Sequence, residues 1–179
     1  TQANGLNQAV SNGNSAVTLT QIADKAMAEQ SNILDIIKQK LIQAGTATTS
    51  ADGIEAIGKD VRKLLAQIDN IASQTTYNGS KLIEGTSSMS AGVSLVFQMG
   101  TLAADTISTV AGVHANTSGM LGLDAIIAGT LSADWSAGGT AADMQSGARD
   151  ILTQVDSALT ELNGWRADFG STQNQLESS

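Results

Sequence analysis

The sequence predicts a mainly α protein with a small β region (α+β): an elongated, rod-shaped bundle of three long helices plus a β-hairpin. Apolar residues recur at alternating steps of three and four over long stretches, which is typical of helices packed side by side. Aromatic residues make up only 3% of a chain that is 41% hydrophobic, and proline is absent. A core of aliphatic side chains without rings favours packed helices over a globule around a ligand.

Three helices are expected, over residues 5–44, 50–76 and 141–177 of a single domain that spans residues 1–179. Thr140 and Asp143 have the spacing of a capping box at the start of the last helix. The first helix would be about 60 Å long at 1.5 Å per residue, so the molecule should be a rod. The expected core seam of the other two helices consists of Ile54, Ile57, Val61, Leu64, Ile68, Ile71, Ile151, Val155, Leu162, Trp165 and Phe169.

Between residues 80 and 110 the pattern changes to short strands. Lys81–Glu84 and Val93–Met99 are the expected strands of the hairpin, with its loop across Thr86–Gly92. Asp105–Val110 is a candidate third strand.

The dipeptide Asn78-Gly79 can be read in two ways. It is a strong signal for a two-residue hairpin turn. The apolar heptad reaches Ile71 shortly before it, however, so Asn78 and Gly79 are interpreted as the stop of the second helix. Residues 111–140, rich in Gly, Ser, Thr and Ala, are expected to form an irregular, minimal outer segment.

The charge pattern and the motifs do not predict an enzyme. The formal net charge is −8 and the cations are scattered singly, which excludes nucleic acid as a partner because phosphate backbones require clustered cations. The sequence has no apolar run long enough to predict a membrane span, and no signal peptide is expected at the start of the chain. With no cysteine and a single histidine, His114, the sequence predicts no metal site and no cofactor. Gly53–Asp60 comes close to a phosphate-binding loop, but Asp60 replaces the required hydroxyl residue and no strand precedes it.

Several short motifs follow one another along the chain. They are Gly5–Ala9 (GLNQA), Leu65–Ala72 (LAQIDNIA), Gln74–Gly79 (QTTYNG), Val96–Gly100 (VFQMG), Gly122-Leu123 and Arg166–Leu176 (RADFGSTQNQL). They resemble motifs of bacterial flagellin, in the same order. The last one is similar to the R-A-D-I-G-x-x-Q-N-Q/R-L signature of the family. Together the motifs span nearly the whole chain and match the rod-shaped core domain of flagellin.

The resemblance implies a structural subunit of the flagellar filament that self-assembles through long helical faces for motility. It implies an extracellular location, reached by export without a cleaved signal peptide. Other flagellin subunits are the implied partners, together with an export chaperone and the filament cap. The inner-tube termini of the family are expected to be absent, so the chain resembles a trimmed core. A hook-filament junction protein of the same superfamily and a coiled-bundle host-binding or adhesin module stay open as alternatives.

One stretch of the first helix departs from the flagellins that the vertebrate innate receptor TLR5 recognises. Those flagellins carry an L-Q-R-V-R-E-L-A-V-Q-like stretch, matched here by Leu34–Gln43 (LDIIKQKLIQ). Ile36 stands at the key Arg, and an aliphatic chain cannot replace the planar donors of a guanidinium. The resemblance therefore implies weak or no TLR5 activation, as in flagellins of Campylobacter and Helicobacter, to which the pattern AMAEQSNILDIIKQK is closer. The candidate subunit or receptor contacts are Asp35, Ile36, Lys38, Gln39, Lys40, Gln43 and Asp60.

Overall fold

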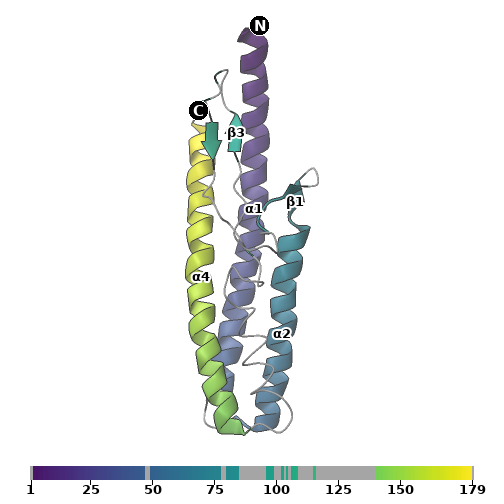
Figure 1. Cartoon of the computed structure of the whole chain (residues 1–179), viewed down its shortest axis with the longest axis vertical. Coiled ribbons are helices and arrows are strands. Elements are labelled where there is room, and N and C mark those ends of the chain that lie inside the picture. The colour runs from purple at the N-terminus through teal and green to yellow at the C-terminus, as the bar shows by residue number, and fades with distance from the viewer. Residues whose placement is uncertain are drawn as a thin grey trace.

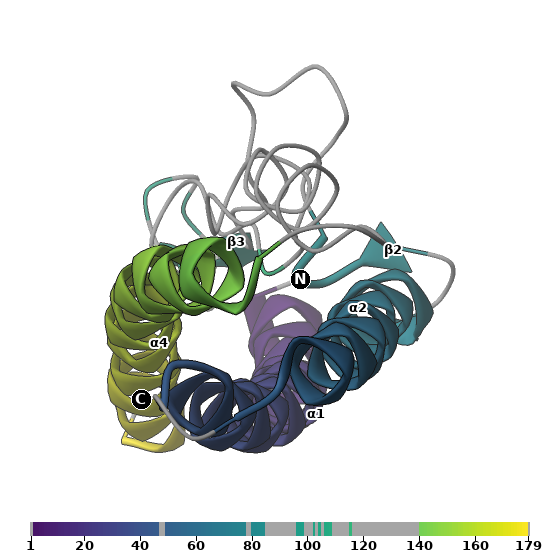
Figure 2. The same cartoon turned by 90° about the horizontal axis from the view of Figure 1, so that it is seen from below.

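The computed structural model describes residues 2–46, 49–77, 80–84, 96–98, 102, 104, 106–108, 115 and 140–178. Its long helices are α1 (Gln2–Ala44), α2 (Ala51–Gln74) and α4 (Ala141–Glu177). Figure 1 shows them side by side in an elongated rod, with both chain ends at the same end of the rod. α1 packs on both other helices, and the end-on view in Figure 2 shows it between them. The predicted rod of three long helices with a small β region is confirmed.

Side-chain hydrogen bonds fix the starts of α2 and α4. The Ser50 Oγ accepts a hydrogen bond from the Gly53 N–H at 3.2 Å. The Thr140 Oγ1 likewise accepts from the Asp143 N–H at 3.2 Å and donates its hydroxyl hydrogen to the Asp143 carboxylate at 2.8 Å. Each cap satisfies a backbone donor that the first helical turn leaves free. The cap predicted at Thr140 is confirmed.

The second helix ends earlier than predicted. It stops at Gln74, and Thr75 follows in extended backbone. The N–H and the hydroxyl of Thr75 both donate to the Ile71 carbonyl, at 3.0 and 2.5 Å. The N–H bond is the last i→i−4 bond of the helix, which ends because Thr75 itself takes an extended conformation and not a left-handed one.

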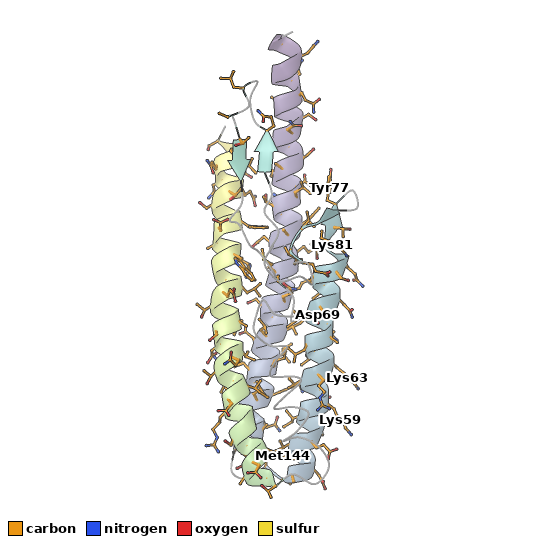
Figure 3. The ribbon with its side chains drawn as sticks, viewed as in Figure 1. Lys59, Lys63, Asp69, Tyr77, Lys81 and Met144 are labelled. Carbon is orange, nitrogen blue, oxygen red and sulfur yellow. The ribbon has the colours of Figure 1, made fainter. Side chains whose placement is uncertain are left out.

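The interpretation of Asn78-Gly79 as a helix stop is therefore wrong. Strand β1 (Thr76–Tyr77) pairs antiparallel with β2 (Ser80–Lys81), so this dipeptide connects the two strands of a hairpin. Its own conformation lies outside the described residues. Lys81 Nζ donates to the carbonyl of Ser73 and ties the hairpin to the end of α2, where Figure 3 labels it.

The other strand pair also differs from the predicted hairpin. β3 (Val96–Gln98) pairs antiparallel with β4 (Thr106–Ser108). The predicted pairing of Val93–Met99 with Lys81–Glu84 is wrong, because β2 is paired with β1 and β3 is paired with β4. The third strand predicted near residue 107 is confirmed as β4. The predicted loop Thr86–Gly92, and all of 111–140 except two residues, lie outside the described residues.

The core seam of α4 follows the predicted pattern without a break. Its buried side chains are separated by alternating steps of four and three residues over ten successive positions, from Met144 to Leu176. The five seam residues expected on this helix are all buried: Ile151, Val155, Leu162, Trp165 and Phe169.

The core seam of α2 drifts away from the predicted heptad. Ile54, Ile57 and Val61 in its first half are buried in the core as expected, and so is Ile68 in its second half. Leu65 and Ala72 are also buried, whereas Leu64 and Ile71 are only partly buried at the edge of the core. The buried positions of α2 thus follow the 3.6 residues per turn of an α-helix more closely than the strict repeat of 3.5 that the prediction assumed.

Candidate functional site

The side of α1 that faces away from the bundle carries four of the predicted contact residues. Asp35, Ile36, Gln39 and Gln43 are exposed, and we call them the outer α1 surface. Ile36 keeps 42% of its surface exposed, although its neighbour Ile37 is fully buried. The outer α1 surface is therefore a mixed one, with an exposed aliphatic side chain beside two carboxamides.

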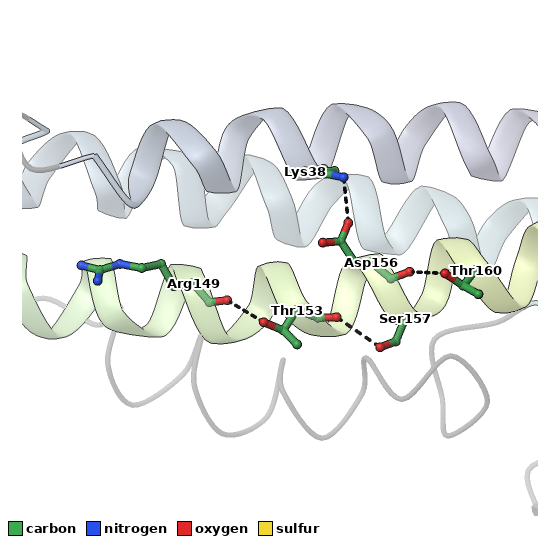
Figure 4. A network of polar contacts seen from close by, with 6 residues as sticks. All are labelled: Lys38, Arg149, Thr153, Asp156, Ser157 and Thr160. Carbon is green, nitrogen blue, oxygen red and sulfur yellow. Dashed lines mark hydrogen bonds and ion pairs between the residues drawn. The ribbon is translucent and has the colours of Figure 1, made fainter.

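Lys38 and Lys40 are directed toward the neighbouring helices. Lys38 Nζ lies 2.8 Å from Asp156 Oδ1 on α4, as Figure 4 shows. Lys40 Nζ lies 3.4 Å from Asp60 Oδ2 on α2. The hydrogen bond to Asp156, with the charge of that carboxylate, raises the pKa of Lys38. Three of the predicted contact residues, Lys38, Lys40 and Asp60, are thus engaged within the molecule.

These two ion pairs mark the edges of the outer α1 surface. Successive residues of an α-helix are turned by about 100° from one another. Gln39 lies between Lys38, which reaches α4, and Lys40, which reaches α2, so Gln39 points away from both helices. Asp35 and Gln43 lie one turn to either side of Gln39 and share its face.

The side of α4 beside Asp156 turns its hydroxyl groups back onto its own helix. Thr153 donates to the Arg149 carbonyl at 3.3 Å, Ser157 to the Thr153 carbonyl at 3.2 Å, and Thr160 to the Asp156 carbonyl at 3.1 Å. Figure 4 shows these bonds running along α4. Asp156 is the member of this network that reaches α1.

A groove between α1 and the end of α2 was missed by sequence reasoning. It is lined by Ile22, Lys25, Ala26, Glu29, Ile71, Gln74, Thr75 and Thr76. Ile22 is an exposed aliphatic residue of this groove. Neither Ile22 nor Ile71 is unusual in a helical pattern, so the sequence carried no signal that would have identified the groove.

The described ranges contain no group of three or more His, Cys, Asp or Glu side chains placed to hold a metal ion. Among the helices that are described, none is long and apolar enough to cross a membrane. Gly53–Asp60, which resembles a phosphate-binding loop, lies inside α2, so its backbone forms a helix and not a loop. His114 lies outside the described residues.

Known proteins similar to this chain are flagellins. A family profile described as "Bacterial flagellin N-terminal helical region" matches residues 1–88. Flagellin A of Helicobacter mustelae is 45% identical over 84 residues, which cover 47% of this chain and 17% of that relative. The flagellin of Bacillus subtilis is 31% identical over an alignment of 189 residues, which covers 98% of this chain and 62% of that relative.

The fold leads to the same family. The crystal structure of Bacillus cereus flagellin is similar with a TM-score of 0.70 and 27% sequence identity, covering 94% of this chain and 85% of that chain. This chain spans only 17% and 62% of the two curated relatives, so it corresponds to part of their length. The resemblance predicted from the sequence motifs is confirmed. The chain belongs to the bacterial flagellin family.

Proposed function

We propose that the chain is the rod-shaped part of a structural subunit of the bacterial flagellar filament, located outside the cell. Its partners are other flagellin subunits, and the full-length protein also meets an export chaperone and the filament cap. The subunit performs no chemistry; it acts by packing the long sides of rods against one another. The observation that carries the proposal is the outer α1 surface, open along a rod of the flagellin family.

The composition of the outer α1 surface suits contact with a second rod. Full burial of the exposed part of Ile36 contributes on the order of 1 kcal/mol. The carboxamides of Gln39 and Gln43 can both donate and accept hydrogen bonds across an interface. Such contributions are small for one contact, but a filament repeats the contact at every subunit.

The charges next to this surface favour close approach. Lys38 and Lys40 are already paired with carboxylates of the same molecule. A second rod therefore does not meet two unpaired ammonium groups, whose desolvation would oppose binding. The contacts of Lys38 with α4 and of Lys40 with α2 leave Ile36, Gln39 and Gln43 free for a partner, with the Asp35 carboxylate on the same surface.

Cysteine labelling tests this proposal, because the chain has no cysteine of its own. Gln39→Cys is introduced into the full-length flagellin, and its maleimide labelling rate is measured on monomers and on filaments. The matched control is Ala66→Cys, an exposed position of α2 three residues after Lys63 and on the same face, which points away from α1 in Figure 3.

The readout is the ratio of the two labelling rates. The proposal expects the rate at Gln39→Cys, relative to that at Ala66→Cys, to fall at least tenfold when filaments form. A ratio that is the same in monomer and filament contradicts a subunit contact at the outer α1 surface.

We propose also that this chain activates TLR5 weakly or not at all, on the basis of Ile36. The aliphatic side chain offers no hydrogen bond donors, whereas a guanidinium offers five. Ile36→Arg should increase signalling in a receptor reporter assay, because position 36 is exposed and can present the new donors. Gln21→Arg, another exposed position of α1, is the control for added positive charge. Strong signalling by the unaltered chain would contradict the proposal.

A further inference from the structure

Gln30 is a polar residue in the middle of an apolar core. Its side chain is fully buried, on the same seam of α1 as Met27 and Leu34. Long polar side chains are rarely buried unless their hydrogen bonds are satisfied. The role of Gln30 is therefore to be sought in the hydrogen bonds that it makes.

The carboxamide of Gln30 joins three separate pieces of the chain. Its Nε2 donates to the carbonyl of Ile68 in α2 at 3.0 Å and to the carbonyl of Ala115 at 2.7 Å. Ala115 in turn donates its N–H to the Ile83 carbonyl at 2.7 Å. Ile83 and Ala115 are fully buried in the same core as α1 and α2.

The orientation of this carboxamide follows from its neighbours. Both groups in front of it are carbonyl acceptors, so the amide must present its NH₂ group to them. Its Oε1 then faces the other way, where it is buried with no hydrogen-bond partner among the residues that the structure describes. An unpaired buried acceptor destabilises the folded state, and an aliphatic residue would avoid that loss. Gln30 is therefore placed for its two donated bonds and not for the stability of the core.

One of the two donated bonds is to α2, and the other holds Ala115 beside residues 80–84. Residues 80–84 follow the β1–β2 turn and lie against α1 and α2, with the Leu82 N–H donating to the Thr75 carbonyl at 3.1 Å. Ala115, which comes after β3 and β4 in the sequence, is hydrogen-bonded to this stretch. We call residues 80–84 together with Ala115 the docked segment.

We infer that Gln30 is a latch: its two hydrogen bonds hold the docked segment on the rod. Without these bonds the segment opens while the helices stay packed. The main packing of the rod is that of α1 on α4, and it does not pass through the docked segment. Loss of the two Gln30 bonds therefore leaves Ala115 held only by its bond to Ile83 and by core packing, so Ala115 should open more often while the α1–α4 core stays packed. This inference does not depend on the role of the protein in a filament.

Native-state hydrogen exchange tests the latch in the whole chain. Gln30→Met and Gln30→Leu both remove the donors and keep the position apolar, with different shapes. Gln21→Met, at an exposed position of the same helix, is the matched control. The readout is the exchange rate of the Ala115 amide divided by that of the Val155 and Ala158 amides in the middle of α4.

Both Gln30 variants should raise this ratio at least tenfold, and Gln21→Met should leave it unchanged. Because the ratio is taken within one protein, a general loss of stability moves both of its terms and cannot imitate the result. An unchanged ratio in folded Gln30 variants overturns the inference. Variants that fail to fold, as judged by circular dichroism, overturn it as well, because Gln30 would then be inseparable from the core of the rod.

Discussion

In the half of the rod where α1 lies against both α2 and α4, α1 turns large aliphatic side chains such as Leu34 and Ile37 into the core. In the half where β3 and β4 take the place of α2, the described residues that α1 buries fully are small, namely Gly13, Ala16 and Thr20, while the larger Val17 and Leu19 are only partly buried. The difference follows from the size of the partner. A third helix needs long side chains to fill the space between cylinders, whereas a strand pair can lie close to α1 where its buried residues are small.

Among the described residues, the buried side chains form two clusters that meet at Leu19. The large core extends from Ala23 along α1 and includes α2, most of α4 and the docked segment. The small one consists of Ala16, Ile107 and Leu176, with Val17 and Leu19 packed against it. We call the parts of the rod around these two cores the three-helix half and the hairpin half. The rod therefore has one continuous pair of helices, α1 and α4, but two different kinds of third layer.

Two alanine substitutions, one in each half of the rod, should have the largest effect on the free energy of unfolding. Leu34→Ala should lower the free energy of unfolding by about 3 kcal/mol, because it empties a fully buried position among helices that cannot close in. Ile107→Ala, in the hairpin half, should cost about 2 kcal/mol or less, because fewer buried side chains surround it and the strand pair can adjust. Urea denaturation followed by circular dichroism measures both. Equal losses from the two substitutions would contradict the division into two cores.

The ion pair near the boundary of the two halves should contribute only a little to the free energy of unfolding. Arg166 Nε on α4 lies 3.2 Å from Asp24 Oδ1 on α1, and both side chains are about one third exposed. Arg166→Met should lower the free energy of unfolding by less than about 1 kcal/mol, because solvent screens exposed pairs. The loss should shrink further at high salt. A loss above about 2 kcal/mol would mean that charge, and not apolar packing, holds the two halves in line.

The helices and most of their seams could be predicted from sequence because the periodic signal is local and long. On α4 the buried positions keep a strict alternation of four and three residues, so the pattern selects Ile151 over its neighbour Leu152, which is only partly buried. On α2 both Leu64 and Leu65 are apolar, and a pattern alone cannot decide which of two adjacent leucines faces the core when the helix drifts from a strict heptad. Leu65 is buried, and not Leu64, because of the positions that α1 and α4 take beside α2.

The strand pairings could not be predicted in the same way. The periodicity that reaches Ile71 does not show where α2 stops, and the helix ends at Gln74, shortly before the hairpin begins. Asn78-Gly79 did carry a correct local signal for a hairpin, since Tyr77 pairs with Ser80, but the helical pattern outweighed it. Which strand pairs with β3 is a question of long-range contact, and short strands have too few residues to encode it locally.

The sequence predicted seven candidate contact residues, and the fold shows which of them are exposed and which are paired within the molecule. Exposure of Asp35, Ile36, Gln39 and Gln43 follows from the seam of α1, because they lie on its opposite side. The sequence could not show that Lys38 is engaged, since its partner Asp156 is more than one hundred residues away. The structure thus narrows seven candidate contacts to the four of the outer α1 surface.

The most direct test of the central claim is a structure of the assembled filament at a resolution that shows side chains. We predict that Ile36 and Gln39 are buried against a neighbouring rod, while Lys38 and Lys40 keep their intramolecular partners Asp156 and Asp60. A filament in which Ile36 and Gln39 remain exposed to solvent would contradict the outer α1 surface as a subunit contact.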